Sequence, residues 1–220
     1  MRKFNSHGFT LIEIAIVLVI IGLLLGGVLK GQELINSAKV KNLAGDFNNI
    51  PVFIYGYQDK FKALPGDDAS VGLHITGGLV CTPAAANFCI TGNGIIDGNW
   101  NATSVSSESF VFWQHVRLAG FAPGPTDTTA ANYLPKNAVG GAIGLTNASN
   151  SAITGLKGSF IICSDGIPGK FAKQLDILLD DGNTATGTLM VTVAGTSTAG
   201  PVIATLNIVD DTPYLVCMGV

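Results

Sequence analysis

Charged side chains are scarce in this 220-residue sequence. Asp, Glu, Lys and Arg make up 12% of the residues, about half of the roughly 25% that is usual for soluble domains. The chain also lacks a basic excess, because 12 basic residues stand against 15 acidic ones. A protein that binds nucleic acid through phosphate contacts needs a concentrated basic patch. We therefore expect no nucleic-acid partner.

Catalytic motifs are also lacking. The chain has three histidines, and we interpret His115, which lies in a predicted helix at ordinary spacing, as a surface or packing residue. No serine or cysteine lies in a recognisable nucleophile motif. The glycines at 92, 94 and 98 are not followed by the lysine of a phosphate-binding loop. We therefore expect no enzymatic activity.

One long apolar run accounts for the low charge. Residues 9–29 read FTLIEIAIVLVIIGLLLGGVL and contain one ionisable side chain, Glu13. As a helix this segment would be about 31 Å long, which matches the hydrocarbon core of a bilayer. An ordinary secretory signal has an apolar region of about 7 to 15 residues, closed by a small-residue cleavage site, and no such site closes this run. The run therefore predicts one membrane-spanning helix.

The start of this run contains a distinctive motif. Residues Gly8 to Glu13 read GFTLIE and follow a short leader with Arg2 and Lys3. This segment resembles the processing motif of type IV prepilins and type II secretion pseudopilins. The resemblance implies that a prepilin peptidase cuts between Gly8 and Phe9, and that the new amine of Phe9 is methylated. Glycine suits the cut, because a backbone without a side chain can extend into a protease cleft.

Glu13 is the residue on which the implied assembly mechanism depends. A carboxylate in an apolar span costs several kcal/mol unless it is paired or neutralised. The resemblance implies that Glu13 pairs with the Phe9 amine of a neighbouring subunit and fixes the register of the filament, as a single buried polar group does in a coiled coil. The alternative is a glutamate that reaches the headgroup layer, since it lies four residues from Phe9.

The resemblance also implies partners and a location. The partners are prepilin peptidase, other pilin subunits, an inner-membrane assembly platform, and membrane lipid before assembly. The chain would cross the bacterial inner membrane once, with its head in the periplasm, and would then enter a pilus or pseudopilus, including one that extends outside the cell. Loss of Arg2 and Lys3 would leave ten basic residues, so that the formal net charge would change from −3 to −5.

We expect a minor or accessory subunit, because the mature chain of about 212 residues is longer than many major pseudopilins and its head is neutral to acidic. The alternative function is an ectodomain that is held by an uncleaved signal anchor and has a binding or enzymatic role. An intact leader would distinguish this alternative from the processed subunit.

The predicted fold is α+β and pilin-like, with a long N-terminal hydrophobic helix packed by its C-terminal half on a globular head with an antiparallel sheet. Apolar residues recur at three- and four-residue steps from Leu34 to Phe61, which is typical of an amphipathic helix. Pro51 is expected to kink or end this helix. We divide the chain into a leader (1–8), a transmembrane and filament-core helix (9–30), an amphipathic continuation (31–63) and the head (64–220).

The head is predicted to have two helices and several short strands. A break at LPGDD, residues 64–68, precedes it. Capping residues and apolar spacing predict helices at 107–120 and 170–179. Branched residues between turns predict strands at 158–162, 188–194, 202–209 and 214–218, and residues 137–155 are predicted to be a loop.

All four cysteines lie in the head, at Cys81, Cys89, Cys163 and Cys217. In an exported head an even count favours two disulfides, with three pairings open. We favour Cys81 with Cys89, which closes a short loop, and Cys163 with Cys217, which ties down the C-terminus as pilin disulfides often do. Zinc is the competing interpretation, but no C-x-x-C pair occurs and His74 is the only histidine nearby.

Two acidic segments could be compared with calcium loops. They contain Asn93, Asp97 and Asn99, and Asp180, Asp181 and Asn183. Neither fits the twelve-residue EF-hand pattern, and Asp, Asn and Gly are also the ordinary residues of tight turns. We interpret both segments as turns and expect no cofactor. Some pseudopilins bind calcium, so calcium is the alternative.

Overall fold

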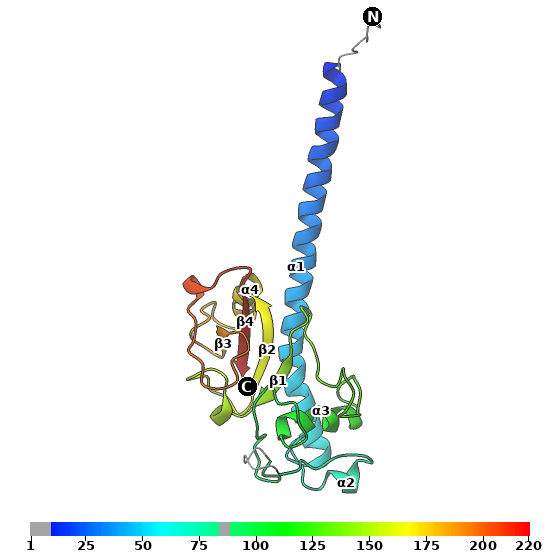
Figure 1. The fold of residues 1–220 in the computed structure, drawn as a ribbon, viewed down its shortest axis with the longest axis vertical. Helices are drawn as coiled ribbons and strands as arrows, with labels where there is room; N and C mark the ends of the chain where they lie inside the picture. Colours follow the sequence, from blue (N-terminus) through cyan, green and yellow to red (C-terminus); the bar gives the residue numbers. More distant parts are fainter. Residues whose placement is uncertain (1–9, 84–88) are drawn as a thin grey trace, which may run out of the picture. The chain divides into compact units, whose positions relative to one another are not determined.

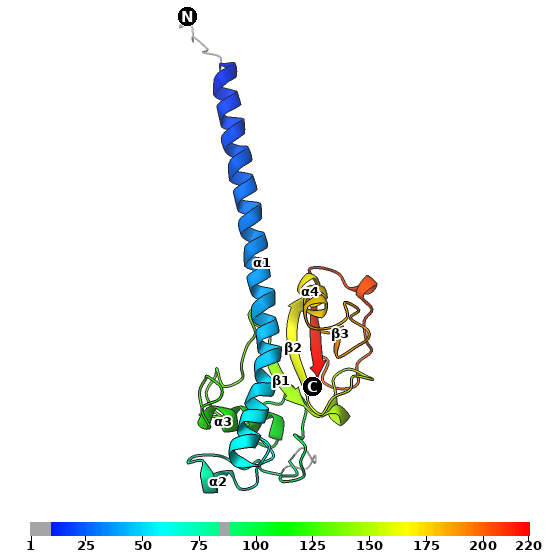
Figure 2. The ribbon, with the colours of Figure 1, turned by 180° about the vertical axis from the view of Figure 1, so that it is seen from behind.

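The computed structural model describes residues 10–83 and 89–220. The chain divides into two compact units, the first ending at Lys39 and the second running from Val40 to Val220. The elements in chain order are α1 (Leu11–Phe61), α2 (Val71–His74), α3 (Glu108–Leu118), β1 (Ile143–Thr146), η1 (Ala148–Asn150), β2 (Ile161–Pro168), α4 (Gly169–Leu179), β3 (Leu189–Val193), η2 (Thr205–Asn207) and β4 (Pro213–Gly219). Figures 1 and 2 label α1 to α4 and β1 to β4. The α+β class expected from the sequence is confirmed.

The first unit consists of the N-terminal part of α1. Of the helices in the described residues, α1 alone is long and apolar enough to cross a membrane, with a mean hydropathy of 2.8 over its most apolar stretch. Large apolar side chains are exposed along this part, among them Leu11, Leu18 and Leu23. Such a surface is stable only in lipid or against other apolar surfaces.

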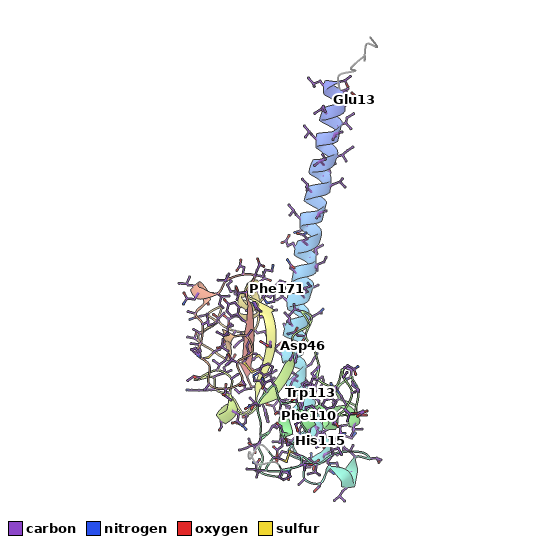
Figure 3. All side chains as sticks on the ribbon, viewed as in Figure 1. Glu13, Asp46, Phe110, Trp113, His115 and Phe171 are labelled. Carbon is purple, nitrogen blue, oxygen red and sulfur yellow. A yellow bond between two sulfur atoms is a disulfide. The ribbon has the colours of Figure 1, made fainter. Side chains whose placement is uncertain are left out.

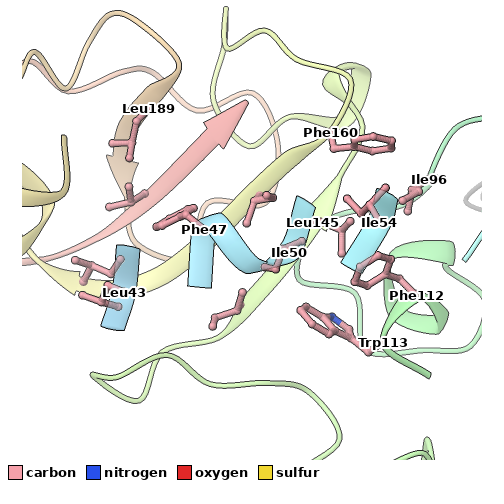
Figure 4. Packing of buried hydrophobic residues seen from close by; sticks show 14 of the residues in the cluster. Leu43, Phe47, Ile50, Ile54, Ile96, Phe112, Trp113, Leu145, Phe160 and Leu189 are labelled. Atoms are coloured by element: carbon pink, nitrogen blue, oxygen red, sulfur yellow. The ribbon is translucent and has the colours of Figure 1, made fainter. Parts of the chain in front are cut away.

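The rest of α1 forms part of the core of the second unit. Its buried residues recur at three- and four-residue steps: Val40, Leu43, Ala44, Phe47, Ile50, Ile54 and Tyr57. Most of them belong to one apolar cluster with residues of the sheet, of α3 and of the segment before β2. Figure 4 shows several of these partners: Phe112, Trp113, Leu145, Phe160 and Leu189. This side of α1 is therefore held by burial of its apolar stripe.

The helix continues ten residues beyond Pro51 to Phe61, so Pro51 does not end it, and the kink that was the other expectation stays a prediction. Proline removes one backbone donor and crowds the preceding turn. Burial of Phe47, Ile50 and Ile54 on both sides of it stabilises the helix against that cost. The helix ends instead just before Lys62, whose φ of 56° is left-handed, and the predicted break at residues 64–68 follows.

The sheet has four strands in the order β1-β2-β4-β3. All three pairings are antiparallel. The predicted strands near β3 and β4 are confirmed, and so are the predicted helices near α3 and α4. Gly120, after the end of α3, has a φ of 85°, as expected of a glycine that ends a helix.

Three predictions for the head, two strands and one loop, need correction. The strand expected at 158–162 is displaced, because β2 begins at Ile161 and runs to Pro168. Residues 202–209 form no strand and contain the short η2 helix. The loop expected at 137–155 contains β1 and η1. The order of the sheet explains the first error, since β2 is a central strand that pairs with both β1 and β4.

Both disulfides have the pairing that we favoured. Cys163 and Cys217 are direct partners in the β2–β4 register, with their Cα atoms 4.1 Å apart. Cys81 and Cys89 are also bonded, with their Cα atoms 5.8 Å apart. The first bridge therefore fixes the C-terminal strand to the centre of the sheet.

Candidate functional site

The start of α1 is organised by a reciprocal pair of polar residues, Thr10 and Glu13. The backbone N–H and the hydroxyl of Thr10 both donate to Glu13 Oε2, at 2.7 Å each. In return, the Glu13 N–H donates to Thr10 Oγ1 at 3.3 Å. This is a capping box, in which the residue before the helix and the third helical residue satisfy each other's free backbone donors. Figure 3 labels Glu13 on the first turn of α1.

The capping box leaves part of the Glu13 carboxylate free. Both Thr10 bonds go to Oε2, and Oε1 makes no hydrogen bond within residues 10–83 and 89–220. Glu13 is exposed and is the only ionisable side chain in the described part of the apolar run. It can therefore keep its cap and still accept a hydrogen bond from another molecule.

Our sequence analysis overlooked Thr10, although the spacing T-x-x-E at the start of an apolar run is a recognised capping signal. The cleavage residues Gly8 and Phe9 lie outside the described residues. Their roles, and the role of Glu13 in pairing, therefore stay predictions.

Four glycines lie on the apolar part of α1, in two pairs on different sides of the helix. They are spaced in two i, i+4 pairs, Gly22 with Gly26 and Gly27 with Gly31. A Cβ atom added at any of the four would meet no atom within 4 Å among the described residues. Small residues at this spacing let another helix approach the backbone closely.

His115 is a packing residue, as one of our two interpretations held. It is fully buried in α3, where Nδ1 accepts a hydrogen bond from the Gly66 N–H at 3.0 Å and Nε2 lies 2.8 Å from the Leu79 carbonyl oxygen. Burial lowers its pKa, which fits a neutral ring with its proton on Nε2. Both nitrogens are therefore occupied by the fold.

A second hydrogen-bond network consists of Tyr57, Asp68 and His74. The Tyr57 hydroxyl donates to Asp68 Oδ2 at 2.8 Å, and His74 Nε2 lies 2.6 Å from the same oxygen. The Ser70 N–H donates to Asp68 Oδ1. Each member thus binds another residue of the chain, and the network connects the end of α1 to the segment that contains α2.

The first acidic segment is anchored by Asp67 and Glu108. Asp67 accepts hydrogen bonds from the backbone N–H groups of residues 92, 93 and 94. Glu108 Oε2 accepts from the Asp97 N–H at 2.8 Å, and Asn93 donates its side-chain amide to Asp97. Most of these carboxylate oxygens bind backbone or side-chain donors, whereas Glu108 Oε1 and Asn99 Oδ1 are buried without a hydrogen-bond partner among the described residues.

The second acidic segment follows α4. Asp181 Oδ1 accepts from the Asn183 N–H at 2.8 Å, and Asn183 Oδ1 accepts from the Ala185 N–H, as in a tight turn. The structure adds a third carboxylate, Asp176, which sequence analysis missed. Its spacing of four residues from Asp180 is the signal that could have found it, because residues at i and i+4 lie on one face of a helix.

Comparison with known proteins gave one match. Residues 3–29 match the family model described as the prokaryotic N-terminal methylation motif. The match covers the leader from Lys3 onwards, the GFTLIE segment and the whole apolar run. No curated protein and no solved structure matches the chain.

Proposed function

We propose that this chain, which carries the N-terminal methylation signature of type IV prepilins and pseudopilins, is a minor or accessory structural subunit of such a filament. Prepilin peptidase would cut after Gly8 and methylate Phe9. The subunit would be inserted in the inner membrane with its head in the periplasm. The assembly platform would then incorporate it into a pilus or pseudopilus with other subunits. Its role would be structural and not enzymatic.

The observation that carries the proposal is the position of Glu13. Its carboxylate caps its own helix through one oxygen, while the other oxygen has no bond within the described residues. A charged amine that comes from Phe9 of another copy would neutralise a carboxylate that is otherwise costly in an apolar setting. The glycine pairs of α1 support the same proposal, because they allow the close helix approach that such a contact needs.

Mass spectrometry of the purified protein tests the processing step. The proposal expects a chain that begins at an N-methylated Phe9. A working form that keeps Met1 would support the alternative, an ectodomain held by an uncleaved signal anchor, and would remove the amine that Glu13 is proposed to bind.

Three variants separate pairing from capping. Glu13→Ala removes both the charge and the cap, whereas Glu13→Gln removes the charge and can still cap, because glutamine also serves in a capping box. Thr10→Val removes the threonine half of the cap and keeps the carboxylate. If pairing is the role of Glu13, both Glu13 variants are cleaved normally but enter filaments at least about tenfold less, which corresponds to about 1.4 kcal/mol.

Thr10→Val is the matched control for this experiment. It is expected to enter filaments at close to the normal level once cleavage is accounted for. If Glu13→Gln assembles normally while Thr10→Val fails, Glu13 acts through the helix cap and the pairing role is wrong.

A further inference from the structure

The C-terminal end of α4 gathers three acidic residues at one point. Asp176 lies in the last turns of the helix, Asp180 is its C-cap, and Asp181 follows. One carboxylate oxygen from each lies within 4.8 Å of the others. Three negative charges at this separation repel one another. The arrangement therefore costs free energy unless another interaction offsets the repulsion.

Asp176 is the member that the rest of the fold does not satisfy. Its side chain is 0% exposed, and neither Oδ1 nor Oδ2 has a hydrogen-bond partner in the described part of the chain. A buried carboxylate without partners costs several kcal/mol unless it is neutralised or binds a cation. One of its oxygens is among the three that converge. The buried carboxylate is therefore directed at the other two.

The other two carboxylates are held in place by the loop after α4. Asp180 Oδ2 accepts from the backbone N–H groups of Thr188 and Leu189, at 2.6 and 2.8 Å. Asp181 binds the Asn183 N–H through Oδ1 and the Thr186 hydroxyl through Oδ2, at 2.8 Å each. These bonds fix the carboxylates and leave lone pairs on each of them. Asp181 is exposed, so that the cluster is open to solvent on one side.

The basic residues of the same helix are engaged elsewhere. Lys170 pairs with Asp211 at 2.9 Å, and Lys173 pairs with Asp210 at 2.6 Å. No ion pair within the described ranges joins a lysine or arginine to any of the three converging aspartates. In this part of the chain, their negative charge is thus not balanced by the positive charge of a paired lysine or arginine.

We propose that Asp176, Asp180 and Asp181 bind one calcium ion. Carboxylate oxygens are hard ligands, which suit Ca²⁺ and Mg²⁺ better than softer metals. Calcium accepts six to eight oxygens in irregular geometry, whereas magnesium demands a near-ideal octahedron. Carboxylates that are already fixed by turn bonds cannot adjust to an octahedron, so they suit calcium better. Water would complete the ligand shell on the exposed side.

The ion would connect two elements of the second unit. Asp176 belongs to α4, and the loop that holds Asp180 and Asp181 leads directly into β3 at Leu189. Gly187 in this loop has a φ of 80°, and a side chain there would overlap the Asp180 carboxylate. Bound calcium would therefore tie the end of α4 to the start of β3. The proposal does not depend on the filament role.

The test is calcium titration of the full chain in detergent after treatment with a chelator. Calorimetry is expected to show one site with a dissociation constant of about 10⁻⁴ to 10⁻³ M, the range of extracellular calcium modules. Calcium at ten times this constant should raise Tm by about 3 to 6 °C. Magnesium should bind at least about tenfold more weakly. Absence of saturable binding at about 10 mM calcium overturns the proposal, and equally tight magnesium binding overturns the choice of calcium.

Two variants and one control locate the site. Asp181→Asn changes an exposed residue and should abolish the calcium-dependent rise in Tm while leaving Tm in chelator within about 2 °C. Asp176→Asn should abolish the same rise, and its Tm in chelator should stay equal or increase, because a buried charge is removed. Asp127→Asn is the matched control, since Asp127 is exposed and holds a similar turn through the Thr129 N–H and hydroxyl. A calcium response that persists in Asp181→Asn, or disappears in Asp127→Asn, overturns the assignment.

Discussion

Glu108 is a fully buried carboxylate at the start of α3. Desolvation raises its pKa to about 8, and the nearby carboxylates of Asp67 and Asp97 act in the same direction. In the unfolded chain the same group titrates near 4.5. The folded state therefore binds more protons between these two values, and the stability that this carboxyl contributes falls as the pH rises through the interval.

This difference predicts a loss of stability on the alkaline side of neutrality. Desolvation also raises the pKa of Asp46, to about 6. Asp46 therefore acts in the same direction, but its contribution to the pH dependence ends above that pH. His115, whose pKa is lowered from 6.5, acts in the opposite direction and only below 6.5. Between pH 6.5 and 8 the free energy of unfolding should fall by about 1 to 2 kcal/mol, as measured by chemical denaturation of the full chain in detergent.

Glu108→Gln should flatten this pH dependence, because an amide does not titrate. The matched control is Glu33→Gln, since Glu33 is an exposed glutamate on α1 that pairs with Lys30. Its pH profile should follow that of the unchanged chain. An unchanged slope in Glu108→Gln would assign the pH dependence to another group.

At the scale of single residues, chemistry could be predicted from the sequence more readily than burial. The GFTLIE segment identified Glu13 because a charge in an apolar run is visible in the letters. The burial of Asp176 could not be predicted, since nothing in its neighbours along the chain shows that its side chain is fully buried. Burial depends on which elements pack together, and that information comes only with the fold.

Among the elements, β2 and β4 are joined by the disulfide that closes the longer of the two loops. The Cys163–Cys217 bridge spans 54 residues and the Cys81–Cys89 bridge spans 8. In the chain-entropy model, these loop lengths correspond to about 4 and 2.5 kcal/mol. The double variant Cys163→Ala with Cys217→Ala should therefore lower the free energy of unfolding by about 4 kcal/mol, and more if the buried site is left with a cavity.

Chemical denaturation under non-reducing conditions measures this difference. The matched control is the double variant Cys81→Ala with Cys89→Ala, which should cost about 1.5 kcal/mol less on loop length alone. If the two double variants have equal stability, or if their order is reversed, loop closure does not determine the contribution of the bridges.

The strand errors have identifiable physical causes. In β1 (Ile143–Thr146) a glycine at 144 weakens the strand pattern, yet a side chain at that position would overlap the Trp100 carbonyl oxygen. Glycine is needed there for a close backbone approach that the sequence does not reveal. Residues 202–209 have branched side chains, but Thr184 donates its hydroxyl to the Ile203 carbonyl oxygen. The Ile203 carbonyl oxygen is thus bound by a side chain and not by the N–H of a neighbouring strand.

For the molecule as a whole, hydrophobic patterning along α1 was the most informative signal. The long apolar run has Glu13 as its one ionisable residue, whereas polar residues recur regularly between the apolar residues of the stripe that follows it. The sequence therefore distinguished a lipid-compatible part from a part that packs on a head. The structure places the boundary between its two units at Lys39 and Val40, within the predicted amphipathic continuation. Val40 is the first buried residue of α1, and a stripe in the sequence does not show where burial begins.

This division predicts that the second unit folds without the apolar run. A shortened chain of residues 31–220 should be soluble without detergent and should unfold in one cooperative transition, since the buried residues of α1 begin at Val40. Within it, Phe47→Ala should lower the free energy of unfolding by about 3 to 5 kcal/mol, the usual cost of removing a buried phenylalanine.

Val52→Ala is the matched control, because Val52 lies on the same helix and its side chain is 61% exposed. It should change the free energy of unfolding by less than about 0.5 kcal/mol. Equal losses in the two variants would mean that α1 does not present its buried stripe to the head. A shortened chain that unfolds gradually would mean that the apolar run is needed for folding as well as for anchoring, because cooperative unfolding requires a core that is complete in itself.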